Sequence, residues 1–157
     1  MLTGCLIDDP PPFAQPKRTP PRLEYHRARP PLDQVIVAST PDQLKFSIPV
    51  ASEDAGEGLV SLLYVDEQFT NFKALPPSTL DDPRERLVLF TYTVPKLQGV
   101  CHKFKIRVGH ASNLPDGDSA PLDSDDLAEA YWLAYLNLPS DQSGAPDCAY
   151  LGEDPAP

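Results

Sequence analysis

The chain has 157 residues, 20 prolines and a formal net charge of −10. Its length fits one domain, and because proline breaks helix interiors, the proline content argues against a helical protein. The negative charge lies in residues 33–157, with 8 Lys or Arg and 20 Asp or Glu, whereas residues 1–32 have a net charge of +2. Such a body repels a phosphate backbone, so nucleic-acid binding is not expected. No apolar run reaches about 18 residues, so no membrane-spanning helix is expected.

The N-terminus carries a short motif, Leu2-Thr3-Gly4-Cys5. It resembles a bacterial lipobox, the site where signal peptidase II cuts before a cysteine that then receives lipid. The resemblance covers four residues and implies that Cys5 anchors an exported lipoprotein in the cell envelope. Leu6 stands where an aspartate would imply inner-membrane retention, which points to the outer membrane, on its periplasmic or surface side. The basic and apolar regions of a signal peptide are missing upstream. Either residues 1–5 are the remnant of a lipobox and the start was assigned downstream of the true one, or the match is accidental and Cys5 is an ordinary thiol.

Residues 6–32 are rich in proline and poor in large apolar side chains. The prolines are Pro10, Pro11, Pro12, Pro16, Pro20, Pro21, Pro30 and Pro31. This composition favours extended polyproline II and cannot bury a core. We therefore predict a stiff tether that holds a folded body, residues 33–150, away from a lipid anchor.

Residues 84–108 organise the predicted body. Residues 87–94 are apolar on both faces, which predicts a central strand covered on both sides. In the following run, Phe104, Ile106 and Val108 alternate with basic residues, which predicts one buried and one solvated face. Further strands are predicted at residues 34–39, 43–50, 59–65 and near 69–72. Pro49 makes the second of these an edge at that point, or ends it.

The last element, residues 125–138, fits two interpretations. Its spacing of apolar residues permits a helix that begins with a capping box, but its aromatic residues on both faces favour a strand. We favour a strand from Ala128 to Leu138, antiparallel to the Phe104 strand. The end of that strand would then return beside Cys101, where Cys148 could reach it. A disulfide between them would close a long loop and stabilise the fold by roughly 3–4 kcal/mol. The alternative is two buried free thiols.

About seven strands separated by turn residues predict an all-β, antiparallel β-sandwich. A cysteine that leads an F-x-I-x-V strand, then a long loop and a final aromatic strand, resembles the end of immunoglobulin-like or fibronectin-type domains. The resemblance covers residues 84–138 at most. Both cysteines lie late in the chain, unlike those of immunoglobulins, which leaves the topology open. Residues 151–157 are expected to form a disordered acidic tail.

The sequence contains no recognised catalytic motif. His26 lies in the tether, and His102 and His110 are about 25 Å apart on an extended strand, so they cannot share a metal ion. We therefore expect no enzymatic activity and no cofactor. One loop offers oxygen ligands of the kind that Ca²⁺ prefers, although a solvated acidic loop is the favoured interpretation and the EF-hand pattern is not met. The candidate ligands are Asn113, Asp116, Asp118, Asp123 and Asp125.

The sequence thus predicts a lipid-anchored, non-catalytic structural or interaction module of the bacterial envelope. A protein partner would dock on the strand of Trp132 and Tyr135 or on an open sheet edge. The alternative is a Ca²⁺-dependent adhesin or carbohydrate-binding domain.

Overall fold

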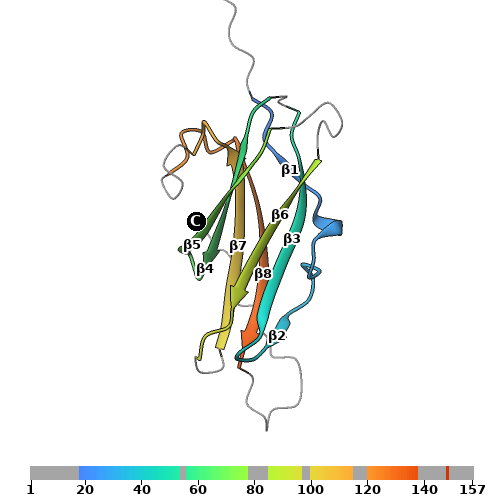
Figure 1. Ribbon diagram of the computed structural model, residues 1–157, viewed down its shortest axis with the longest axis vertical. Helices are drawn as coiled ribbons and strands as arrows, with labels where there is room; N and C mark the ends of the chain where they lie inside the picture. Colours follow the sequence, from blue (N-terminus) through green and yellow to red (C-terminus); the bar gives the residue numbers. More distant parts are fainter. Residues whose placement is uncertain are drawn as a thin grey trace, which may run out of the picture.

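The computed structural model describes residues 18–53, 56–77, 85–96, 100–114, 120–137 and 148. Two β-sheets face one another across the main core (Figure 1), and a second, small cluster of buried residues contains Val60, Leu62, Tyr64 and Leu114. The three-stranded sheet contains β1 (Arg22–Leu23), β3 (Gln43–Ala51) and β6 (Glu85–Thr93). The five-stranded sheet contains β2 (Ile36–Ala38), β8 (Leu127–Leu136), β7 (Val100–His110), β4 (Leu59–Val65) and β5 (Gln68–Leu75). One 3₁₀ turn, η1 (Tyr25–Arg27), precedes β2. The predicted class, an all-β immunoglobulin-like sandwich, is confirmed. Within the described ranges, no helix is long and apolar enough to cross a membrane.

The strand interpretation of the last element is correct. β8 runs antiparallel to β7 from Val100 opposite Leu136 to Gly109 opposite Leu127. Among the described strands, the one departure from antiparallel pairing is β2, which runs parallel to β8. Strand β8 thus has hydrogen-bonded partners along both of its edges. Its core face, with Ala130, Trp132, Ala134 and Leu136, is buried, whereas Tyr131 on the outer face is 45% exposed.

The core is built around three aromatic rings from both sheets. The ring of Phe46 on β3 lies 4.9 Å from that of Phe104 and 5.1 Å from that of Trp132, measured between centroids. All three side chains are completely buried. The predicted alternation of β7 is correct, because Phe104, Ile106 and Val108 point into this core. Trp132 therefore packs between the sheets and is not the exposed docking residue that the sequence predicted.

The prediction that the 87–94 strand is covered on both sides is wrong. Val88 and Phe90 of β6 point into the core, but Leu87 and Leu89 are 48% and 47% exposed on the outer face. β6 pairs with β3 in the three-stranded sheet, whereas β7 belongs to the opposite sheet. Apolar residues on both faces show that a strand can be covered, but not that any element covers it.

The N-terminal segment does not remain a tether as far as residue 32. Leu23 and Ala28 are buried against the core, and the segment follows the edge of β3 (blue in Figure 1). The backbones of Arg29 and Ser47 exchange two hydrogen bonds of 2.8 and 2.7 Å. The indole nitrogen of Trp132 donates to the carbonyl of Pro30 at 2.7 Å. These contacts pack residues 22–30 against the core, so the folded domain begins well before residue 33.

Pro49 explains the shape of this segment. Leu23 pairs with Val50, and Arg29 pairs with Ser47. Between these two pairs the N-terminal segment is six residues long, whereas the antiparallel stretch of β3 is three residues long. The three extra residues are those of η1. The carbonyl of Pro49 accepts a hydrogen bond from Glu24 N at 2.9 Å, but its nitrogen has no hydrogen to donate. Pairing is therefore interrupted at Pro49, and the edge predicted there is occupied by a bulged segment.

Candidate functional site

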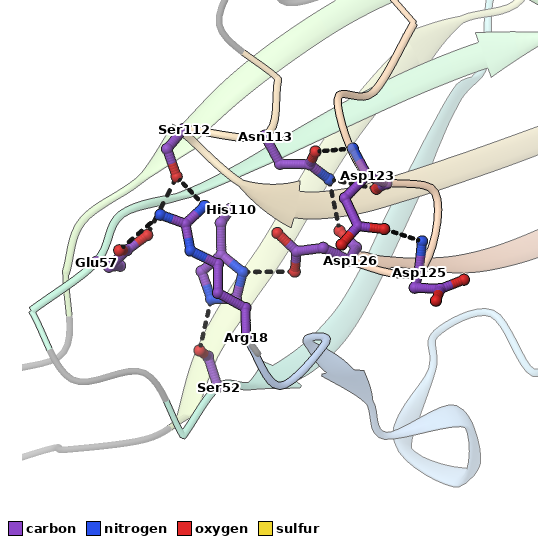
Figure 2. Close-up of polar contacts among 9 residues, drawn as sticks. All are labelled: Arg18, Ser52, Glu57, His110, Ser112, Asn113, Asp123, Asp125 and Asp126. Carbon is purple, nitrogen blue, oxygen red and sulfur yellow. Dashed lines mark hydrogen bonds and ion pairs between the residues drawn. The ribbon is translucent and has the colours of Figure 1, made fainter. Parts of the chain in front are cut away.

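A buried polar cluster closes one end of the sandwich, where β3 and β7 both end (Figure 2). His110 Nδ1 lies 2.6 Å from Asp126 Oδ1, and His110 Nε2 lies 3.1 Å from Ser52 Oγ. His110 is 0% exposed, and Ser52 and Asp126 are each 2% exposed. Strand alternation places the ring of His110 on the core face of β7, in the same row as Phe104. The cluster therefore joins the end of β3 to the start of β8 through the interior.

The glycine before His110 permits this close packing. A side-chain carbon added at Gly109 would lie 2.9 Å from Leu127 Cδ2, 3.0 Å from Leu114 Cδ1 and 3.1 Å from the backbone oxygen of Asp126. These approaches are tighter than nearly all real side-chain carbons make, so the neighbouring atoms would have to shift by a few tenths of an ångström. Gly109 thus lets the loop before β8 lie directly against β7.

The order of groups, serine, histidine and aspartate, is that of a nucleophilic relay. Ser52 also borders a surface pocket of about 500 Å³ between the N-terminal segment and β8. The Ser52 side chain is nonetheless almost completely buried, whereas a nucleophile must meet its substrate. At the other end of the core a second histidine–aspartate pair occurs, and no serine accompanies it among the hydrogen bonds that the structure shows there. We therefore interpret the hydrogen-bonded histidine–aspartate pair at each end as a structural feature that closes the core.

That second pair consists of His102 and Asp66, whose Nδ1 and Oδ2 atoms lie 2.6 Å apart. Asp66 also makes two hydrogen bonds with the backbone of Lys103 on β7: its nitrogen donates to Lys103 O and its side-chain Oδ1 accepts from Lys103 N, both at 2.9 Å. Burial, and then the charge of Asp66, raise the pKa of the nearby Tyr92. The two histidines lie eight residues apart on one face of β7, which is consistent with the separation that the sequence predicts.

In the predicted calcium loop, the side-chain amide of Asn113 forms hydrogen bonds within the loop itself. Asn113 is buried, its Oδ1 accepts from Asp123 N at 2.7 Å, and its Nδ2 donates to the carbonyls of Asp123 and Asp126 at 2.8 and 3.0 Å. One carboxylate oxygen of Asp123 accepts from Asp125 N at 2.9 Å. Asn113 thus holds the loop together, and its role as a calcium ligand stays a prediction. Nowhere in the described part of the chain do three or more His, Cys, Asp or Glu residues gather into a metal site.

Two of the proposed calcium ligands, Asp116 and Asp118, lie outside the described residues, as does the predicted lipid attachment point Cys5. The acidic tail, residues 151–157, lies outside them too. Calcium binding by the remaining aspartates stays a prediction.

Above the buried cluster, the N-terminal segment is tied to the loop by charged groups. Arg18 donates to Ser112 Oγ at 2.5 Å and to Glu57 Oε1 at 3.1 Å, and Ser112 Oγ donates to Glu57 Oε2 at 3.2 Å (Figure 2). These residues are far apart in sequence, so local spacing gave no signal for them. A signal for His110 did exist, because it shares the alternation of Phe104, Ile106 and Val108.

The sequence predicted the pairing of Cys101 with Cys148, and the structure contains this disulfide, with Cα atoms 5.7 Å apart. Cys101 lies opposite Tyr135 on β8, so the end of β8 returns beside it as expected. Tyr135 is half-buried on the outer face of the five-stranded sheet, unlike the fully buried Trp132. Of the two predicted docking residues, Tyr135 alone retains accessible surface.

The four edges of the two sheets differ in how they are protected. β1 and β2 are two and three residues long. β5 carries an irregular register beside Leu63 and Tyr64, and Lys73 lies on it. β6 is nine residues long, pairs with β3 without interruption, and contains neither Pro nor Lys. Natural edges usually carry such irregularities or charges to prevent pairing with another chain. β6 is therefore the open edge of the described structure.

The backbone of β6 can be oriented from the bonds of β3. Because Ser47 exchanges both backbone hydrogen bonds with Arg29, its neighbours Phe46 and Ile48 direct theirs toward β6. The alternate residues of β6 consequently turn their N–H and C=O groups away from β3. We call these five residues the β6 edge: Glu85, Leu87, Leu89, Thr91 and Thr93.

Comparisons with known proteins give a likeness of fold. No family model matches the chain, and no curated protein matches it. Among solved structures, the CARDB domain of the PF1109 protein from Pyrococcus furiosus, whose crystal structure is described as a complex with di-metal ions, is similar at 10% identity. The match covers 74% of this chain and 90% of that one, with a TM-score of 0.44. A solution NMR structure of the same domain matches at 14% identity, covering 64% and 85% of the two chains, with a TM-score of 0.39. At these values the likeness says nothing about function.

Proposed function

We propose that this chain is a lipid-anchored, non-catalytic interaction module of the bacterial cell envelope, which docks through the β6 edge. The observation that carries the proposal is the combination of an open nine-residue strand with two exposed leucines. Strand addition at such an edge uses backbone hydrogen bonds for affinity and alternate side chains for specificity. An exposed apolar row beside backbone groups that are free to pair is a ready template for another strand.

The non-catalytic part of the proposal is supported by the buried polar cluster. Ser52, His110 and Asp126 hydrogen-bond to one another inside the core. The histidine–aspartate pair recurs at His102 and Asp66, where no serine accompanies it among the hydrogen bonds of the described residues, and this recurrence supports a structural role.

Anchoring is supported by the motif Leu2-Thr3-Gly4-Cys5 and by the proline-rich sequence between Cys5 and Arg18. A polyproline segment of that length would span roughly 40 Å. The disulfide between Cys101 and Cys148 also fits an oxidising, exported compartment. Lipid chains give stable membrane attachment when more than one is present.

The test places the full chain behind the basic and apolar regions of a secretory signal, so that Leu2–Cys5 forms the cleavage site. We expect the mature protein to carry acyl mass on Cys5, to sediment with membranes, and to accumulate as a precursor in globomycin. The matched control is Cys5→Ser, which should remain unprocessed by signal peptidase II. A mature wild-type protein without acyl mass on Cys5 would contradict the anchoring.

A further inference from the structure

We infer that the β6 edge pairs with the β6 edge of a second copy of this chain, antiparallel and centred on Leu89. The two three-stranded sheets would then become one continuous sheet across a two-fold axis. This inference rests on the proposed function, because it names the partner of the same edge.

The backbone of β6 permits this pairing without rearrangement. Its partner β3 is paired with it continuously from Gln43–Thr93 to Ala51–Glu85, so the strand is regular along its whole length. The residues of the β6 edge direct their N–H and C=O groups outward, and Leu89 lies at the middle of the nine. A two-fold axis through Leu89 therefore brings outward-facing backbone groups opposite outward-facing backbone groups, as an antiparallel ladder requires.

The side chains favour this centre. Leu89 would lie opposite Leu89 of the second copy, Leu87 opposite Thr91, and Glu85 opposite Thr93. No like charges meet in this register, and the two exposed leucines of each copy form a single apolar patch. Cross-strand neighbours of this kind stabilise a sheet, whereas like charges directly opposite destabilise it.

Charge also selects the β6 edge over the rest of the surface. The chain has a formal net charge of −10, so two copies repel one another on average. Along the β6 edge the one charged side chain is Glu85, and it already forms an ion pair with Arg27 of its own chain (Oε2 to NH1, 2.5 Å). The β6 edge thus allows two acidic molecules to approach without bringing like charges opposite each other.

The opposite edge, β5, is a poor site for the same pairing. It exposes Phe69 and Phe72, but its register with β4 is irregular between Leu63 and Tyr64, and Lys73 lies on it. A bulge and a lysine are the devices that prevent edge pairing in natural sheets. β5 therefore serves as the internal control for β6.

Sedimentation velocity of the purified full chain, over a range of concentrations and at two salt concentrations, tests the inference. We expect a monomer–dimer equilibrium that shifts toward dimer as salt rises, because salt screens the repulsion between acidic copies. Leu89→Lys puts two ammonium groups directly opposite each other and should weaken association by about tenfold or more. Phe72→Lys on β5 is the matched control and should leave association unchanged.

Two further variants test the register. Thr93→Lys places an ammonium group opposite Glu85 of the second copy at both ends of the pairing, and should tighten association by about two- to fivefold. In a Cys5→Ser background, Leu89→Cys should give a covalent dimer on mild oxidation, whereas Lys45→Cys on the neighbouring strand β3 should not.

A monomer at all concentrations, or a dimer that persists in Leu89→Lys, would overturn the inference. A monomer whose Cys5 carries lipid would overturn the dimer and leave the anchoring intact. A dimer whose Cys5 lacks lipid would do the reverse, so the two failures are distinguishable.

Discussion

The two ends of the sandwich core are closed by the same chemical pair in different surroundings. At the Ser52 end, the side chains of His110 and Asp126 are 0% and 3% exposed, and both ring nitrogens of His110 are hydrogen-bonded. At the other end, the carboxylate of Asp66 is 46% exposed. Both ends leave a buried atom without a hydrogen-bond partner among the described residues, Asp126 Oδ2 at the first and His102 Nε2 at the second. Water screens the second pair and not the first. The comparison teaches that burial of the aspartate, more than the pairing itself, decides how much each end contributes to stability.

The largest effect is expected at the His102 end, from the disulfide beside it. Replacing Cys101 and Cys148 by Ala removes a crosslink between residues 47 apart in sequence, and should lower the free energy of unfolding by about 3–4 kcal/mol. Urea unfolding of the oxidised wild type and of the double variant measures the difference, with Cys5→Ser as the control. A loss below about 1 kcal/mol would mean that this end holds without a covalent link, contrary to the loop-entropy argument.

The next effect separates the two ends directly. Asp126→Asn should cost about 2–3 kcal/mol of unfolding free energy, because it alters the fully buried pair with His110. Asp66→Asn should cost less than about 1 kcal/mol, because its carboxylate is half exposed and asparagine tolerates the positive φ of 50° at this position. Urea midpoints of both variants give the comparison.

Equal losses in Asp126→Asn and Asp66→Asn would break the argument from burial. A different outcome would break the structural interpretation of the Ser52 end: a fluorophosphonate probe that labels Ser52 in the wild type but not in Asp126→Asn would show a working nucleophile.

A smaller effect should follow from crowding at the Ser52 end. Gly109→Ala adds a carbon 3.1 Å from the backbone oxygen of Asp126 and should destabilise the fold by roughly 1–3 kcal/mol. Gly58→Ala is the matched control, since its added carbon meets the nearest atom at an ordinary 3.6 Å. Thermal unfolding of both variants measures the contrast, and similar melting temperatures would show that the loop before β8 is free to move.

The smallest effect is a pH dependence at the His102 end. Burial and the charge of Asp66 raise the pKa of Tyr92 in the folded state. The unfolded chain therefore loses this proton first, so the contribution is complete below about pH 10 and is lost as the pH rises above it. Tyr92→Phe should make the fall in urea midpoint between pH 9 and pH 11 less steep. A steeper fall in the variant would reverse the sign of the argument.

Particular residues show how far sequence reasoning reached. Alternation in β7 was predictable because Phe104, Ile106 and Val108 share one face and basic residues the other. The pairing of β8 beside Cys101 followed from antiparallel geometry and two late cysteines. Pro49 marked an edge because a missing N–H is tolerated there. In the candidate site, however, Asn113 and Trp132 were assigned by residue type alone, and both proved to be buried and hydrogen-bonded.

The sequence alone determined the all-β class, the inward row of β7, the strand nature of β8 and the pairing of Cys101 with Cys148, because these depend on local alternation and chain geometry. Tertiary structure alone decided that residues 22–30 cover the edge of β3, that Leu87 and Leu89 face solvent, and that His110 meets Ser52 and Asp126. These facts depend on which sheet each strand joins and on what covers its outer face. Such choices are made by contacts between distant residues, which no short stretch of sequence contains.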